Sequence, residues 1–129
     1  MVARAPLISV LVVAYKSGAY LPRCLAALTA QRFRDFEVLV LTTAMKPMRR
    51  YEAALRTLHA RFGNRLTLRI SLDHFAKAAH EGERGADSWA PALDGLRWLS
   101  RHGFAIAVAG RILPSEGEAA IRDGYGRLF

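Results

Sequence analysis

Asp73 and His74 are the two adjacent residues in this sequence with the most direct potential for acid-base chemistry. They follow the apolar segment 66–72, and the ligands of parallel sheets bind where strands end. A histidine beside a carboxylate can act as a general base, because the carboxylate stabilises the imidazolium. A solvated or capping Asp-His pair is the simpler interpretation, so both roles stand as alternatives.

Arg111 and Ser17 are the two candidate anion ligands. Arg111 follows Gly110 after the apolar segment 104–109, where its guanidinium could bind an anion or simply be solvated. Ser17 precedes a helical pattern, so its hydroxyl could contact phosphate or cap that helix.

Metal ligands are sparse. His80 and Glu81 lie with Glu83 on a segment that contains glycine, which predicts a flexible and therefore poor site. Cys24 is the single cysteine, which excludes an internal disulfide and any cluster that needs several thiolates. We therefore predict no metal site, and we expect Cys24 to be buried and inert on a helix.

Composition limits the class of protein. The chain has 129 residues, of which 52% are hydrophobic, so we expect one domain over residues 1–129. A formal charge of +8 favours polyanions, but the arginines are dispersed along the sequence, and we expect a solvated basic surface rather than a nucleic-acid site. The longest apolar stretch, 7–15, is far shorter than the roughly 20 residues of a membrane span. We expect a cytoplasmic protein.

Apolar segments of two kinds alternate along the chain. Four have strand character, at 7–14, 36–41, 66–72 and 104–109, and four have helical spacing, at about 20–28, 45–62, 89–102 and 115–128. Segment 7–14 is β-branched without polar alternation, which predicts a strand covered on both faces. Segment 66–72 alternates, which predicts one less covered face, as at a sheet edge. We expect 73–87 to be a loop with perhaps one helical turn, and Ser88 to cap the next helix.

This alternation predicts the fold class α/β, with four consecutive βα units, a parallel sheet and right-handed crossovers. Two arrangements fit the pattern. One is an open, Rossmann-like sheet with the first strand near its middle, and the other is four sequential units that form half of a barrel. The half-barrel predicts a homodimer, because two copies could hide each other's edge strands.

Residues 6–41, PLISVLVVAYKSGAYLPRCLAALTAQRFRDFEVLVL, resemble the start of family 2 glycosyltransferases, which have a GT-A fold. The resemblance implies that the backbone after the first strand holds a nucleotide-sugar, with a divalent metal on its diphosphate. The matching positions here are Val13, Ala14, Tyr15 and Ser17. No Asp-x-Asp pair occurs in the chain. The resemblance therefore implies a nucleotide-sugar-binding fragment without a complete catalytic site.

Residues 36–129 are similar to the middle of radical S-adenosylmethionine proteins, on the segments VLVLTTAMKPM, LTLRISLDHF and AVAGR. This second resemblance implies a partial barrel whose strand ends approach S-adenosylmethionine. It places Thr42, Ser71, Asp73 and Arg111 near that ligand. The three clustered cysteines of that family are absent, so the alternative function is a cluster-less barrel fragment. The two resemblances meet at a fusion point near 36–44, and a non-enzymatic structural or interaction domain is the third alternative.

Overall fold

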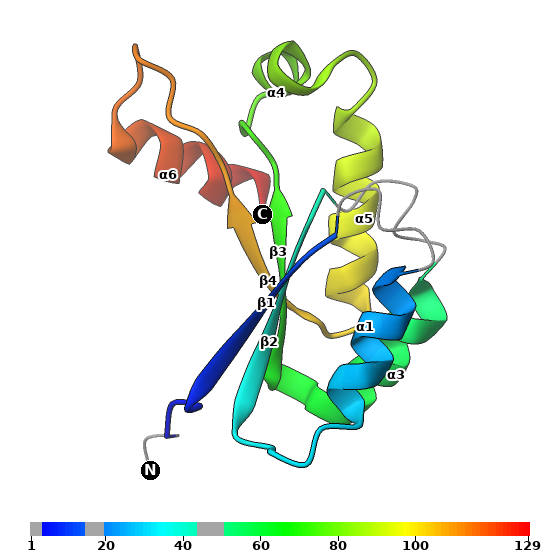
Figure 1. The fold of residues 1–129 in the computed structure, drawn as a ribbon. Coiled ribbons are helices and arrows are strands. Elements are labelled where there is room, and N and C mark those ends of the chain that lie inside the picture. The colour runs from blue at the N-terminus through cyan, green and yellow to red at the C-terminus, as the bar shows by residue number, and fades with distance from the viewer. Residues whose placement is uncertain (1–3, 15–19, 44–50) are drawn as a thin grey trace.

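The computed structural model of the chain describes residues 4–14, 20–43 and 51–129. In these residues strands and helices alternate (Figure 1). The elements are β1 (Ile8–Val13), α1 (Tyr20–Thr29), β2 (Phe36–Thr42), α3 (Glu52–Phe62), the short 3-10 helix η1 (Gly63–Arg65), β3 (Leu66–Ser71), α4 (Lys77–Arg84), α5 (Trp89–Arg101), β4 (Ala105–Ala109) and α6 (Glu118–Leu128). The predicted α/β class is confirmed.

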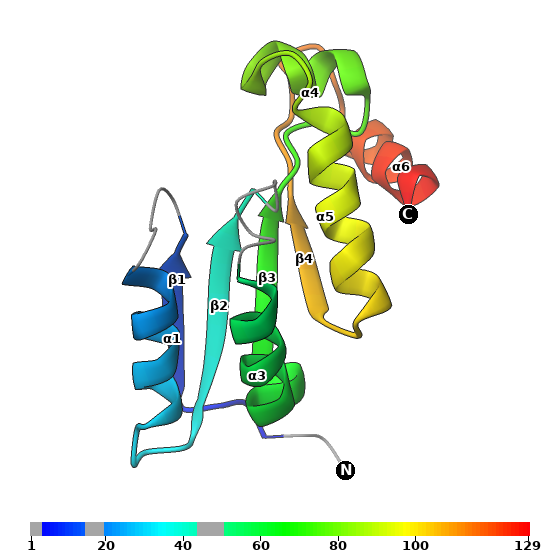
Figure 2. The same ribbon diagram turned by 90° about the vertical axis from the view of Figure 1, so that its right-hand side faces the viewer.

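The four strands form one parallel sheet in the order β1-β2-β3-β4. This is the order of half a βα barrel, and it leaves β1 and β4 as the two edges. Successive right-handed crossovers that always advance in one direction place their helices on one face of the sheet. Accordingly, α1, α3 and α5 lie on the same side, while α6 lies beyond β4 near its carboxyl end (Figure 2).

The core lies between the sheet and these three helices. Alternate residues of the central strands point into it and are almost completely buried, as are the apolar residues of the helices that face them. The buried set includes Phe36, Val38, Val40, Leu66, Leu68, Ile70, Leu21, Leu25, Leu55, Leu58, Leu96 and Leu99.

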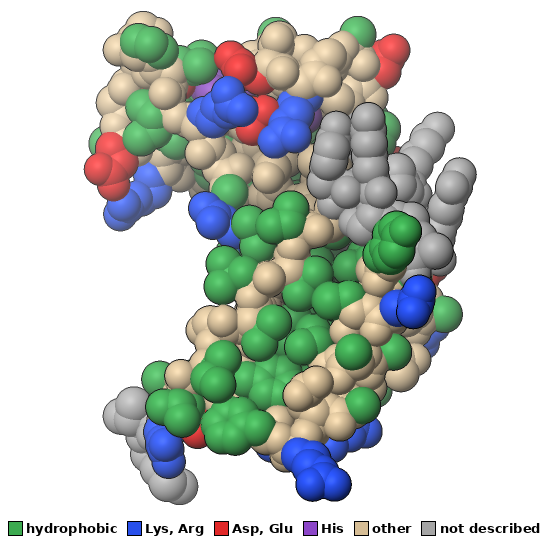
Figure 3. All heavy atoms as spheres, in the orientation of Figure 1, with side chains coloured by type: hydrophobic (Ala, Val, Ile, Leu, Met, Phe, Trp, Pro, Cys, Tyr) green, Lys and Arg blue, Asp and Glu red, His purple; other side chains and the backbone are tan. Residues whose placement is uncertain are grey.

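The opposite face of the sheet, which we call the open face, has none of the described helices packed along it. By strand alternation and register it carries Ser9, Leu11, Val13, Glu37, Leu39, Leu41, Thr67, Arg69, Ser71, Ala105, Ala107 and Ala109. Leu11 is 62% exposed and Val13 69% exposed. In Figure 3 this flank of the molecule is hollowed and bears hydrophobic side chains.

One expectation about strand environment was wrong, and a second was right about the less covered face of segment 66–72 but wrong about its place at a sheet edge. β1 is an edge strand with exposed side chains rather than a strand covered on both faces, and its β-branched composition reports strand propensity, not burial. β3 lies inside the sheet rather than at its edge. Its alternation arises because its second face belongs to the open face.

Three further expectations were wrong. Residues 77–84 form the helix α4, which lacks the apolar stripe that sequence periodicity detects. Ser88 precedes α5 but makes no capping bond, because its hydroxyl donates instead to the Gly85 carbonyl at 2.8 Å. Cys24 is exposed, since α1 turns Leu21, Leu25 and the partly buried Leu28 toward the core instead.

A glycine with a positive φ angle follows each of two helices. Gly63 and Gly103 follow α3 and α5 with φ of 54° and 74°, a left-handed conformation that glycine adopts without a Cβ penalty. Trp89 and Trp98 are partly buried and pack against the core.

Candidate functional site

The carboxyl ends of β3 and β4 carry the densest group of ionisable side chains in the described residues. We call this group the carboxyl-edge cluster. Its members are Asp73, His74, His80, Glu83, Arg84, Arg111, Glu116 and Tyr125. The cluster links the segment after β3, helix α4, the segment after β4 and helix α6. These parts of the chain meet because parallel strands have their carboxyl ends at the same edge of the sheet.

Asp73 is the centre of the cluster. Its buried carboxylate accepts two hydrogen bonds from Arg84, with Nε at 2.7 Å from Oδ2 and Nη2 at 3.3 Å from Oδ1. The guanidinium of Arg111 lies 3.6 Å from Oδ1, and the Arg111 backbone N–H donates to the Asp73 carbonyl at 2.9 Å. Arg111 also donates to Glu83 at 3.1 Å. The negative charge of Asp73 is thus compensated from within the chain.

His74 does not pair with its neighbour in sequence. Its Nε2 lies 2.7 Å from Oε1 of Glu116, and its Nδ1 accepts the backbone N–H of Ala76 at 2.9 Å. With Nδ1 as an acceptor, a neutral ring carries its proton on Nε2 and donates it to Glu116. Neither ring nitrogen of this buried histidine is therefore free to take a proton from a ligand.

His80 is enclosed in the same cluster, although its sequence context predicts a flexible loop. Its Nδ1 accepts the backbone N–H of Asp73 at 3.1 Å, and its ring meets the edge of Trp89. Desolvation lowers the pKa of His80 below its ordinary 6.5, and Arg84 acts in the same direction, against the opposing carboxylates of Asp73 and Glu81.

Tyr125 closes the cluster from α6. Its hydroxyl donates to the Leu72 carbonyl at 2.5 Å. Burial, with smaller contributions from the carboxylates of Asp73 and Glu116, raises the pKa of Tyr125 to about 12. The phenol is therefore a neutral donor that fixes α6 to the end of β3.

The remaining sequence-predicted residues are spread apart. Val13 ends β1 on the open face, and the Ala14 backbone N–H donates to the Leu41 carbonyl at 2.8 Å, as part of the sheet. Strand alternation places Thr42 on the helix-covered face and Ser71 on the open face. Tyr15 and Ser17 lie outside the described residues. Among the sequence-predicted residues that the structure describes, Asp73, His74 and Arg111 are brought together in the carboxyl-edge cluster.

Sequence reasoning missed Arg84, Glu116 and Tyr125. One signal was available for the first of them, because His80 and Arg84 are four residues apart and so share a face if their segment is helical. Glu116 is 42 residues from its partner His74, and Tyr125 is 53 residues from its partner Leu72. Pairs so far apart in sequence cannot be predicted from a local spacing.

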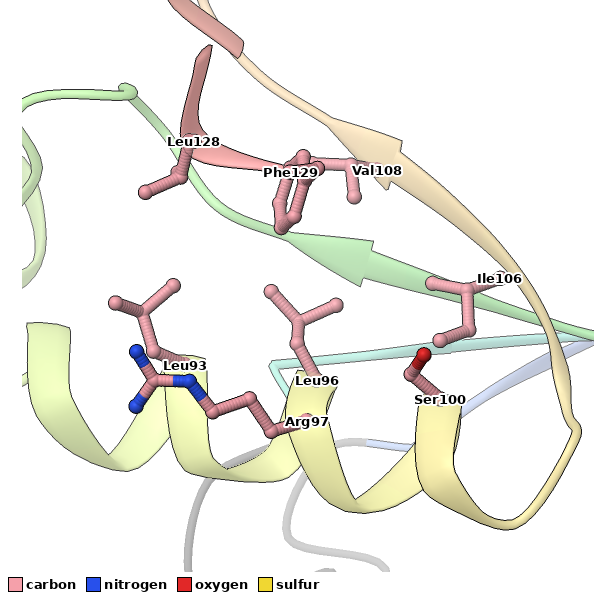
Figure 4. Close-up of a pocket in the computed structure, with 8 residues that line it drawn as sticks. All are labelled: Leu93, Leu96, Arg97, Ser100, Ile106, Val108, Leu128 and Phe129. Carbon is pink, nitrogen blue, oxygen red and sulfur yellow. The ribbon is translucent and has the colours of Figure 1, made fainter. Parts of the chain in front are cut away.

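An apolar groove of about 410 Å³ lies away from the cluster, between α5, β4 and the last residues described (Figure 4). Its walls are Leu93, Leu96, Ile106, Val108, Leu128 and Phe129, with polar groups from Arg97 and Ser100. None of the sequence-predicted site residues lines it.

Within residues 4–14, 20–43 and 51–129, no group of three or more His, Cys, Asp or Glu side chains could hold a metal ion. No helix in the same part of the chain is long and apolar enough to cross a membrane.

The fold and this site define a parallel βα protein with sequential strands and a self-compensated polar cluster at the carboxyl edge. No family model, no curated protein and no solved structure matches the chain. Its function must therefore be argued from its own surfaces.

Proposed function

We propose that this chain is an assembly domain, which forms a dimer by packing the open faces of two copies against each other. The observation that carries the proposal is the open face itself, where Leu11 and Val13 are exposed beside Leu39 and Leu41 on the side of the sheet away from the described helices α1, α3 and α5. Full burial of a leucine or valine side chain stabilises by about 1.5–3 kcal/mol. A second sheet packs about 10 Å from the first and would remove these side chains from water.

The charges of the open face favour a second copy as the partner. Arg69 lies beside Leu41 in the register of β2 and β3, and Glu37 lies four residues earlier on β2, about 13 Å along the strand. In one such dimer the two-fold axis lies between the two sheets and is perpendicular to the strands. The amino end of each sheet then lies against the carboxyl end of its partner. This arrangement brings Arg69 of each copy close to the partner's Glu37, and such reciprocal contacts are typical of a two-fold interface.

Strand order favours assembly over nucleotide binding. Open nucleotide-binding sheets use a crevice at a switch point of the strand order, flanked by strands on both sides. Here β1 is an edge strand and the order is sequential. Of the four strand-end positions that the radical S-adenosylmethionine resemblance implies, Thr42, Ser71, Asp73 and Arg111, the two charged ones are engaged within the chain. Asp73 pairs with Arg84 and Arg111, and Arg111 also pairs with Glu83.

Charge exchange tests the assembly proposal directly. Sedimentation velocity of the wild-type chain should show a dimer, and Arg69→Glu or Glu37→Arg alone should shift it toward monomer. The double variant should restore the dimer, because each copy again presents opposite charges to the other. Arg56→Glu changes the charge by the same amount as Arg69→Glu, but at an exposed position on α3 away from the open face. This variant should leave the dimer intact.

A monomeric wild-type chain, or a double variant that dissociates as readily as the single variants, would refute this interface. Calorimetric titration with uridine diphosphate plus manganese, and separately with S-adenosylmethionine, distinguishes the ligand-binding alternatives. Saturable binding of either ligand by a monomer would favour the corresponding resemblance over assembly.

A further inference from the structure

The edge of the sheet opposite the carboxyl-edge cluster gathers arginines that are dispersed in the sequence. We call it the amino edge, formed by the segments that lead into the four strands, residues 4–7, 30–35, 62–65 and 102–104. These segments and the helix turns before them carry Arg4, Arg32, Arg34, Arg61, Arg65 and Arg101. Because strands are spaced about 4.8 Å apart, the four segments span about 15 Å across the sheet. The register also displaces the start of β4 along the strand direction by three residues, about 10 Å, relative to the start of β2.

Direct contacts tie the first three of these segments together at the start of β2. Arg65 donates from Nε and Nη2 to the Phe36 carbonyl, at 3.0 and 2.7 Å. The Leu7 backbone N–H donates to the Asp35 carbonyl at 3.2 Å, and Arg4 lies 3.5 Å from the Asp35 carboxylate. The basic groups of these three segments therefore lie along the same edge of the sheet.

The charge of this surface is largely uncompensated. Asp35 is the one acidic residue within the four segments, and it faces Arg4. Arg34 and Arg65 are held by carbonyl oxygens, Arg34 by that of Thr29 at 3.1 Å, so these guanidinium groups are positioned without being neutralised. At the carboxyl-edge cluster, by contrast, arginines and carboxylates pair, and Figure 3 shows blue and red side chains adjacent at that end.

An exposed aromatic ring lies within the basic surface. Phe33 is 46% exposed and stands between Arg32 and Arg34 in the segment from α1 to β2. A planar ring flanked by cations can stack on an unpaired base while the guanidinium groups contact the adjoining phosphates. Bases in a duplex are already stacked on each other, so this combination fits a single strand.

We propose that the amino edge binds single-stranded nucleic acid, with Arg32 and Arg34 on phosphates and Phe33 on a base. The site is separate from the open face, so it does not depend on the dimer proposed above. It also differs from the earlier expectation of a solvated basic surface, because the fold brings together cations that are far apart in sequence.

The test is fluorescence anisotropy of a labelled oligothymidylate of about 20 nucleotides, at salt concentrations from about 50 to about 200 mM. Replacing Arg32 and Arg34 together by glutamine should weaken binding about tenfold at low salt and reduce the slope of log affinity against log salt by about 1.4. Phe33→Leu should weaken binding by about five- to a hundredfold with little change in that slope.

The matched control replaces Arg122 and Arg127 of α6 by glutamine. These exposed arginines pair with Glu118 and Asp123, and their loss changes the net charge by the same amount. The control should bind like the wild type, and circular dichroism should confirm that all variants are folded. Absence of binding at about 50 mM salt, equal weakening by the control pair, or wild-type affinity in Phe33→Leu would overturn the proposal.

Discussion

His80 is a buried ionisable side chain that serves the fold through its neutral form. It is 2% exposed, and the Asp73 backbone N–H occupies its Nδ1 lone pair. Protonation would turn that acceptor into a donor and add a positive charge to a site where desolvation and the charge of Arg84 already lower the pKa of His80. The imidazole is consequently a structural hydrogen-bond acceptor.

Stability should therefore decrease in mildly acidic solution. Because the pKa of His80 is lowered in the folded state, the unfolded chain binds more protons once the pH falls below the ordinary value of 6.5. The free energy of unfolding should fall between about pH 6.5 and the lower folded pKa, by at most about 1.4 kcal/mol per pH unit. Urea unfolding of the wild type and of His80→Asn, which keeps an acceptor at the Nδ1 position, measures this effect.

The asparagine variant should lose most of that pH dependence. His102→Gln is the control, because His102 is exposed and its removal should leave the slope unchanged. An equal slope in the wild type and in His80→Asn would contradict the assignment.

The ion pairs of the chain should differ sharply in their contributions. Arg84→Gln removes a two-point contact to the buried carboxylate of Asp73, so it should lower the free energy of unfolding by about 1–3 kcal/mol. Arg122→Gln removes an exposed pair with Glu118 on α6 and should cost less than about 0.5 kcal/mol. Chemical denaturation of both variants provides the comparison, and similar losses would mean that burial of Asp73 does not strengthen its pairing.

At the scale of elements, two glycines of α6 have opposite surroundings. A methyl group at Gly124 would overlap the ring of Phe75, which itself packs against Tyr125, whereas a methyl group at Gly126 would meet open space. The closeness of α6 to the segment after β3 therefore depends on Gly124. This requirement explains why a residue that weakens helices lies in the middle of one.

Alanine substitution at these two glycines should change stability in opposite directions. Gly124→Ala should lower the free energy of unfolding by about 1–2 kcal/mol, because the ring must move from a packed position. Gly126→Ala should raise it by up to about 1 kcal/mol through helix propensity. Thermal unfolding of both variants is the measurement, and a stabilised Gly124→Ala would show that α6 does not need this close approach.

The sequence predicts the existence of most elements but not their surroundings. The apolar pattern located all four strands, because a strand needs alternating or continuous apolar residues whatever the order of the strands in the sheet. It could not predict that β1 is exposed, since Val and Ile favour strands at edges and in interiors alike. It missed α4, whose buried face consists of His80 rather than an apolar stripe.

At the scale of the whole molecule, strand order was the property that the pattern left open. Each βα unit obeys the same local rules in an open sheet and in half a barrel, and the difference lies in which strands become neighbours. The candidate site depends on that order, because β3 and β4 must be adjacent for Asp73 and Arg111 to meet. The two residues were foreseen individually, but their mutual ion pair was not.

The sequential order of the strands has a consequence for how the chain acquires its structure. In the described part of the chain each strand pairs with its neighbours in sequence, and the intervening segments hold one helix between β1 and β2, α3 and the short η1 between β2 and β3, and the two helices α4 and α5 between β3 and β4. Contacts between such near neighbours close short loops and favour rapid folding. During synthesis, the emerging chain can extend the sheet at one edge, and each strand finds the preceding one already available for pairing.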